Sequence, residues 1–410
     1  MLMARGVIVT LLSILFYFTT LLGGQAPHPV EPMAPPAQQR TYEVLGQTAL
    51  LAADAVTVRS GPSAEADALG VIKKDTARVI ILDHQAGWYK VHLSSGLSGW
   101  VPEHALTIVP SVPKPLDRLI VGYFEPGEAA YDTLLAHSTK LTATAPLGWS
   151  LDSYGGITAD FDPQEMGRSL YFAGNQELLT FAHVRVPASP TRLLSSAYLQ
   201  QQAISQLVNV VAEWGLKGLI IHFDYVPEGE QYELFSFLQG LQAELAAKGG
   251  RTLVSFPWDE NLDYAAASRA ADYVVLQGSR DTKEPGPLAA LVELDQMLAA
   301  ITKTVDARKI ILALSTSGLD WPRTGGAQVL SHEQVMDLAA RQGAKIRWDS
   351  VSMTPYFHYG NGHEVWFENR YSMKYKLELV AKYNLAGAAL GNLGQEDPEI
   401  WDSAAELLIG

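Results

Sequence analysis

The chain has 410 residues, of which 48% are hydrophobic and 18% charged, so it is long enough for two folded units and too apolar for general disorder. Its formal net charge of −14 would repel a phosphate backbone, which argues against nucleic acid as a partner. The absence of cysteine excludes a disulfide framework, thiolate metal sites and a cysteine nucleophile.

The N-terminus has the pattern of an export signal. Arg5 precedes an apolar run over residues 6–24, whose length lies between a signal-peptide core and a membrane span. For residues 1–24, cleavage after Gly24 and retention as a membrane anchor both remain open, and the membrane is a partner only in the second case. Residues 25–44 are rich in proline and predict an extended linker. The remainder is expected outside the cell, in the wall or anchored on the outer side.

Residues 45–109 predict a small all-β barrel, because short β-rich runs alternate with turn residues. Three motifs follow in order, at residues 56–63, 87–91 and 99–101. In this order the segment resembles the bacterial SH3 family. The resemblance implies a module that holds exported proteins on peptidoglycan or related wall polymers, with Trp88 and Trp100 as candidate wall-binding residues. The alternative is that both tryptophans belong to the core and that the barrel is a spacer.

Residues 110–116 predict a second linker, and residues 117–410 predict an α/β fold, a closed (β/α)8 TIM barrel. Eight apolar strand-like runs alternate there with helical stretches, at residues 119–123, 141–147, 178–183, 218–223, 252–256, 273–276, 310–314 and 386–390. An open doubly wound sheet is the competing fold, but no glycine-rich phosphate turn follows the first run. An insertion at about 325–368, with a helix expected over residues 332–342, could wall a groove.

Short motifs recur along residues 117–410 in a fixed order. They are VGYF at 121–124, ADYVVL at 271–276, EPGP at 284–287, GLDW at 318–321, HEVWFE at 363–368 and LGQEDP at 393–398. In this order they resemble glycoside hydrolase family 18, in particular bacterial extracellular members related to spore-cortex and wall-acting enzymes. The resemblance implies a TIM barrel that acts on N-acetylglucosamine-containing polymers such as peptidoglycan or chitin, without a cofactor.

The family's catalytic motif is degenerate on the fourth strand. Family members carry D-G-x-D-x-D-x-E, in which the glutamate protonates the glycosidic oxygen and the preceding aspartate orients the substrate's N-acetyl group. Here the motif positions are taken, in order, by Lys217, Gly218, Ile220, His222 and Asp224. On strand six, M-x-Y-D aligns with residues 277–280, QGSR, and the strand-eight tryptophan aligns with a glycine at 391. Because three strands depart from the family chemistry, we interpret the barrel as a pseudoenzyme.

Strand alternation places Ile220, His222 and Asp224 on one face of the fourth strand, so the two polar side chains are expected at the barrel mouth. An aspartate is shorter than a glutamate by one bond of about 1.5 Å, and a misplacement of about 1 Å can cost about 100-fold in rate. If the protein is active, Asp224 is the candidate proton donor and His222 its charge partner. A buried ion pair that stabilises the strand end is the structural alternative.

Aromatic residues near strand ends are the candidate sugar contacts. They are Tyr123, Trp149, Tyr225, Trp258 and Trp321. The histidines lack metal-ligand spacing, so no metal site is expected. No G-x-S-x-G motif supports a serine hydrolase.

The sequence therefore leaves three functional hypotheses. The first is an exported wall-associated protein that binds amino-sugar polymers, peptidoglycan or a chitin-like polymer, with lost or much reduced hydrolysis. The second is an active glycosidase that cleaves N-acetylglucosamine-containing polymers with Asp224 as proton donor. The third is an exported scaffold that binds no sugar.

Overall fold

The computed structural model describes residues 43–409 apart from 75–77, 94, 112, 115–116, 187–188, 228 and 280–283. The predicted signal or anchor at 1–24 and nearly all of the proline-rich linker lie outside these residues. Within the described ranges, no helix has both the length and the apolar character needed to cross a membrane.

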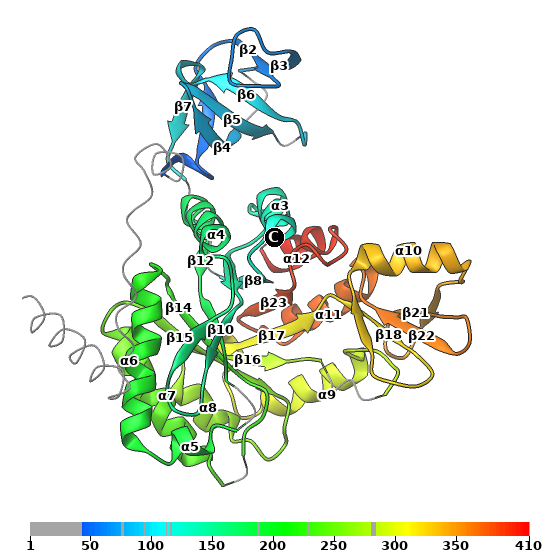
Figure 1. Cartoon of the computed structure of the whole chain (residues 1–410). Helices are drawn as coiled ribbons and strands as arrows, with labels where there is room; N and C mark the ends of the chain where they lie inside the picture. The colour runs from blue at the N-terminus through cyan, green and yellow to red at the C-terminus, as the bar shows by residue number, and fades with distance from the viewer. Residues whose placement is uncertain are drawn as a thin grey trace, which may run out of the picture.

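The N-terminal unit is an antiparallel β structure, drawn in blue in Figure 1. Its strand order is β3-β2-β6-β5-β4-β1-β7. The strands are β1 (Thr48–Leu51), β2 (Ala55–Arg59), β3 (Ala68–Lys73), β4 (Val79–Gln85), β5 (Trp88–Leu93), β6 (Ser98–Pro102) and β7 (Leu106–Val109). Alternate residues of these strands point inward and form a separate hydrophobic core that includes Val58, Ile81, Val91 and Val101. The all-β character predicted for this segment is confirmed.

The C-terminal unit contains all eight predicted strands, of which the second and third are each broken in two. β9 (Ala143–Pro146) continues as β10 (Trp149–Leu151), and β12 (Leu179–Thr180) continues as β13 (Ala182–Val186). β9 pairs with β12 and β10 pairs with β13, both in parallel, so the second strand is joined to the third. The remaining neighbours are also paired in parallel, including the last strand with the first. The barrel is therefore closed, as predicted.

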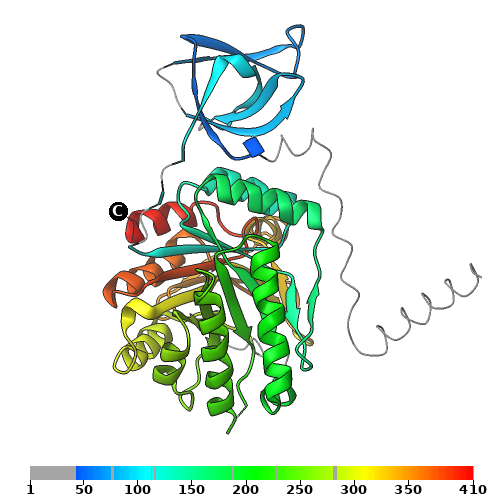
Figure 2. The ribbon, with the colours of Figure 1, turned by 90° about the vertical axis from the view of Figure 1, so that its left-hand side faces the viewer.

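The other barrel strands are β8 (Leu119–Phe124), β14 (Gly218–Phe223), β15 (Arg251–Pro257), β16 (Tyr273–Gln277), β17 (Ile310–Ser315) and β23 (Gly387–Gly391). β11 (Ile157–Ala159) is antiparallel to β10. The helices around the barrel are α3 (Glu128–His137), α4 (Pro163–Asn175), α5 (Thr191–Leu194), α6 (Ala197–Glu213), α7 (Gln231–Ala246), α8 (Tyr264–Ala270), α9 (Leu291–Ile301), α11 (Arg370–Lys382) and α12 (Ile400–Leu408). Figures 1 and 2 show them as an outer layer.

Strand alternation divides the barrel into two cores. Ile220, Leu253 and Val275 belong to the inner core enclosed by the strands. Leu219 and Ile221 belong to the outer core between strands and helices. The alternation predicted for the fourth strand is thus confirmed, and it directs the side chains of His222 and Asp224 toward the barrel mouth.

The insertion after the seventh strand forms a small sheet with one helix. The sheet order is β19-β18-β22-β21-β20, with strands β18 (Gly318–Trp321), β19 (Gln328–Leu330), β20 (Arg347–Asp349), β21 (Thr354–Tyr359) and β22 (His363–Phe367). The helix α10 (His332–Gln342) has the predicted bounds. It begins at a capping box between Ser331 and Gln334 and ends at Gly343, whose φ of 58° is the left-handed conformation that glycine adopts readily.

The small β unit is packed against α4 of the barrel (Figures 1 and 2). Asn175 Nδ2 donates to the Leu45 carbonyl at 2.7 Å, and the Gln176 side-chain amide donates to the Gly46 carbonyl. Gly46 has a φ of +80°, and a Cβ at this position would lie 2.9 Å from Phe172. Only glycine fits this close approach, so a larger residue at position 46 would force the small β unit and α4 apart.

Candidate functional site

The barrel mouth contains a three-residue polar group at the ends of strands three and four. Arg185, near the end of β13, donates to Asp224 Oδ2 through Nε at 2.9 Å and through a terminal nitrogen at 2.7 Å. His222 Nε2 lies 3.2 Å from Asp224 Oδ1, the contact expected from the i, i+2 spacing on one strand. Both oxygens of Asp224 therefore have a nitrogen partner.

His222 is also held from the other side. Its Nδ1 lies 3.1 Å from Ser255 Oγ on β15, and Gln277 Nε2 on β16 lies 3.4 Å from the same nitrogen. Burial lowers the pKa of His222, and the neighbouring Asp224 carboxylate opposes part of this shift. The His222 ring is thus fixed between the neutral side chains of Ser255 and Gln277 on one side and the Asp224 carboxylate on the other.

The rings of His183 and Tyr123 lie next to His222 and extend the polar group across the barrel mouth. The rings of His183 and His222 lie 4.9 Å apart, and Tyr123 meets His183 edge to face at 5.3 Å. Burial, together with the nearby His222, lowers the pKa of His183 to about 3. Burial also raises the pKa of the Tyr123 hydroxyl. Both side chains are therefore neutral near pH 7.

In this arrangement Asp224 is held as a hydrogen-bond acceptor. A carboxylate held by two guanidinium N–H groups is a hydrogen-bond acceptor, and it would have to leave that pair before it could donate a proton. At the position where the family pattern has an aspartate, His222 supplies no negative charge to steady a developing cation. Gln277 occupies the start of the strand-six motif and donates to Phe223 O at 3.3 Å.

The predicted aromatic contacts fall into two groups. Trp149 is 2% exposed and packs edge to face against Phe161 at 4.8 Å, and Trp321 is 3% exposed and packs with Leu319. Neither offers a ring face to a sugar in this structure, because protein side chains already cover both.

Tyr225, Trp258 and Tyr123 keep some accessible surface. Tyr225 is 53% exposed and follows Asp224 directly in the chain. Trp258 is partly buried and stacks on Tyr264 at 5.4 Å, beside a pocket of about 360 Å³ that Asp259 and Glu260 also line. In the small β unit, Trp88 is partly buried, whereas Trp100 is 9% exposed and belongs to the buried residues.

Arg185, His183 and Ser255 form part of the site and were not among the predicted site residues. In the parallel register His183 lies beside Ile220 and Arg185 beside His222. The H-x-R spacing on strand three repeats the H-x-D spacing on strand four, and this repetition was the available sequence signal. Among the described residues, no group of three or more His, Asp or Glu side chains could hold a metal ion.

The closed parallel barrel, with polar residues at the carboxyl ends of its strands, defines a protein of the TIM-barrel class. The family model for glycosyl hydrolases family 18 matches residues 191–396. The chain belongs to glycosyl hydrolase family 18. The model for the bacterial SH3 domain matches residues 54–107. Both predicted resemblances are confirmed.

Relatives and solved structures agree with this assignment. The chain is 28% identical to the cortical fragment-lytic enzyme of Bacillus subtilis over 51% of its own length and 54% of that protein, and 24% identical to the uncharacterized glycosylase YvbX of B. subtilis over 69% and 89%. The chain spans about half the length of the cortical fragment-lytic enzyme and of the B. subtilis protein YdhD.

Among solved structures, a chitinase from Chromobacterium violaceum has 26% identity and a TM-score of 0.65, over 71% of this chain and 98% of that one. The spore cortex-lytic enzyme SleL of Bacillus megaterium has 20% identity and a TM-score of 0.64, over 74% and 77%, which shows the shared fold.

Proposed function

We propose that the protein is a wall-associated member of family 18 that binds amino-sugar polymers, peptidoglycan or a chitin-like polymer, and hydrolyses them little or not at all. The observation that supports this most is the state of Asp224, whose two oxygens are engaged by Arg185 and His222. The other acidic positions of the family motif on the fourth strand are occupied by Lys217, Ile220 and His222, none of which is a carboxylate. Exposed Tyr225 and partly exposed Trp258 leave sugar-stacking surface at the same rim.

The bacterial SH3 unit supports a location at the cell wall, outside the cell. Relatives include proteins named for lysis of spore cortex fragments, and the proposed export signal at residues 1–24 is consistent with that location. The SH3 unit is then a second polymer contact, with Trp88 as the more accessible of its two candidate tryptophans.

The test is product analysis by mass spectrometry after incubation of the full chain with purified peptidoglycan and with chitin oligosaccharides. We expect binding to sedimented polymer without new reducing ends, and we expect Asp224→Ala to leave binding within about twofold. Glu244→Ala, which removes an exposed acid on α7 outside the described site, is the matched control. Turnover that disappears in Asp224→Ala but not in Glu244→Ala would establish the active-glycosidase alternative. Absence of any polymer binding would favour the scaffold.

A further inference from the structure

A groove of about 540 Å³ lies between the insertion and the barrel, outside the site described above. Trp348 of β20 lines one side, and Tyr371, Lys374, Tyr375 and Glu378 of α11 line the other. The four helix positions follow the pattern i, i+3, i+4 and i+7, so they share one face of α11. The groove is thus formed by a strand edge and a helix face.

The walls of the groove are aromatic and accessible. Trp348 is 39% exposed, Tyr371 63% and Tyr375 40%. The rings of Trp348 and Tyr375 lie 6.3 Å apart at an angle of 53°. Partly exposed rings that line a groove present flat apolar faces, which is the surface that pyranose rings stack against.

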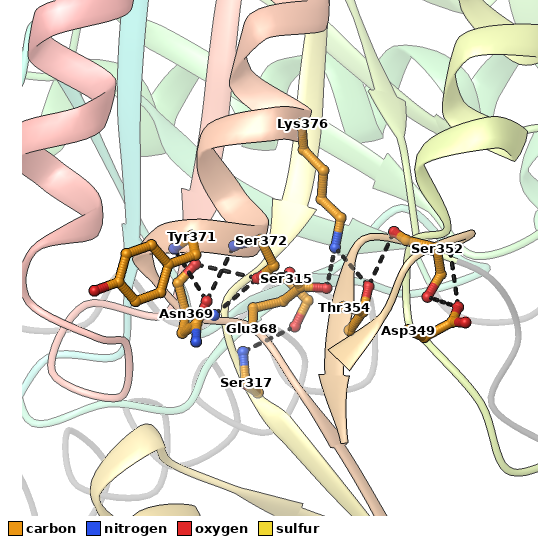
Figure 3. Close-up of polar contacts among 10 residues, drawn as sticks. All are labelled: Ser315, Ser317, Asp349, Ser352, Thr354, Glu368, Asn369, Tyr371, Ser372 and Lys376. Carbon is orange, nitrogen blue, oxygen red and sulfur yellow. Dashed lines mark hydrogen bonds and ion pairs between the residues drawn. The ribbon is translucent and has the colours of Figure 1, made fainter. Parts of the chain in front are cut away.

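On the opposite face of α11, polar side chains connect the helix to the insertion, and Figure 3 shows Lys376 between Glu368 and Thr354. The Lys376 ammonium contacts the Glu368 carboxylate and lies 3.3 Å from Thr354 Oγ1 on β21. Thr354 pairs with Asp349 in the β20–β21 ladder, next to the pair of Trp348 and Pro355. Because these polar contacts are buried, the strand that carries Trp348 is fixed relative to the helix, and the groove is pre-formed.

The charge of the groove is opposite to that of the chain. The chain has a net charge of −14, yet the groove has two cations, Arg347 and Lys374, against one acid, Glu378. Among the residues that the structure describes, neither cation forms an ion pair. An anionic polymer would be repelled by most of the surface and attracted here.

We propose that this groove is a second polymer-binding site, for an amino-sugar strand that carries carboxylates, as peptidoglycan does, in preference to neutral chitin. The aromatic rings stack on the sugars, and Arg347 and Lys374 pair with carboxylates of the strand. This inference rests on the proposed function, since it assumes that the protein binds wall polymers, and it selects one polymer among those that the function allows.

The test is a binding isotherm of the full chain on purified peptidoglycan and on chitin, at low and at high salt. We expect Trp348→Ala to weaken binding to peptidoglycan about tenfold. Arg347→Glu combined with Lys374→Glu is expected to weaken peptidoglycan binding at least as much at low salt, to lose this effect at high salt, and to leave chitin binding unchanged. Tyr232→Ala, which removes a tyrosine that is 82% exposed, and Lys248→Glu are matched controls outside the groove.

The outcomes separate the two proposals. If the unchanged chain binds peptidoglycan and the groove variants bind equally well, the groove proposal is wrong and the proposed function stands. If charge reversal weakens peptidoglycan and chitin binding alike, the preference for carboxylates is wrong. If the unchanged chain binds neither polymer, the proposed function itself fails. Circular dichroism melting of each variant checks that the exposed substitutions leave the fold intact.

Discussion

Replacing Lys376 by methionine is expected to destabilise the barrel by about 3–5 kcal/mol, the usual cost of breaking a buried ion pair from one side. The side chains of Lys376 and Glu368 are 0% and 1% exposed. Burial lowers the pKa of Lys376, and the contact with Glu368 opposes this shift. Methionine fills most of the volume of the lysine stem, but it leaves the Glu368 carboxylate in the core without a cation. Ser372, which donates to that carboxylate at 2.7 Å, is then its remaining partner within the group.

The double variant distinguishes a lost pair from a lost shape. Lys376→Met combined with Glu368→Leu is expected to lie within about 1 kcal/mol of the unchanged chain, because well-packed apolar side chains often replace a buried pair at little cost. The Ser372 hydroxyl keeps an acceptor in this variant, since Asn369 O lies 3.1 Å away and can accept its hydrogen bond in place of the carboxylate.

The assay is urea unfolding followed by tryptophan fluorescence. The signal reports mainly on the C-terminal unit, because all tryptophans except Trp88 and Trp100 lie in the barrel or its insertion. Lys382→Met, at the end of the same helix, is the matched control. Its partner Asp295 lies 2.6 Å away, but both side chains are exposed, so the midpoint should move little. A shift in Lys376→Met no larger than that of Lys382→Met would refute the reasoning, as would a double variant as unstable as the single one.

Three further predictions concern pH, chemistry and the contact between the two units. The pKa of His183 is lowered from 6.5 to about 3, so between these pH values the unfolded chain binds more protons than the folded chain, and stability falls as pH falls. This residue should lower the free energy of unfolding by up to about 2 kcal/mol between pH 7 and pH 5, and His183→Gln should reduce that pH dependence. An unchanged slope would contradict the assignment. Asp224→Glu alone should leave chitin-oligosaccharide hydrolysis within about tenfold of the unchanged chain, whereas Asp224→Glu combined with His222→Asp should hydrolyse faster than Asp224→Glu, since one electrostatic stabiliser is worth about 100- to 1,000-fold. Equal rates in the single and the double variant would count against the role given to position 222. Gly46→Ala should loosen the small unit from α4 and increase the maximum dimension of the protein in X-ray scattering. Gly87→Ala is the control, because a Cβ at Gly87, which has a φ of +78°, would have no atom within 4 Å, so the dimension should not change. Identical scattering curves for the two variants would show that the close approach of Gly46 to α4 is unimportant.

Most of the fold was predictable because its strands are local features. Each barrel strand is an apolar run bounded by turn residues, and the helix over residues 332–342 begins directly after a serine that caps it. The breaks in strands two and three were not predicted. The break in strand two lies at residues 147–148, where Gly148 has a φ of +112°. A single glycine in an apolar run is not enough to predict such a break.

The site was predictable along one strand and not between strands. The contact of His222 with Asp224 follows from alternation alone. The contact of Arg185 with Asp224 depends on the register of two strands that α5 and α6 separate in the chain. The same limit explains the aromatic residues. Trp149 and Trp258 both lie at strand ends, but the burial of Trp149 is set by a side chain distant from the strand, Phe161.

The seat of the small barrel on α4 has a consequence for how a polymer is engaged. The backbone carbonyls of Leu45 and Gly46 are held by Asn175 and Gln176, so the unit is docked rather than tethered. Under the proposed function, the distance between the sugar contacts of the small barrel and those of the large barrel is then fixed. A rigid pair of contacts gains avidity only on strands whose repeat and curvature match that spacing. The two barrels together would thereby select a polymer by the spacing of its strands as well as by its chemistry.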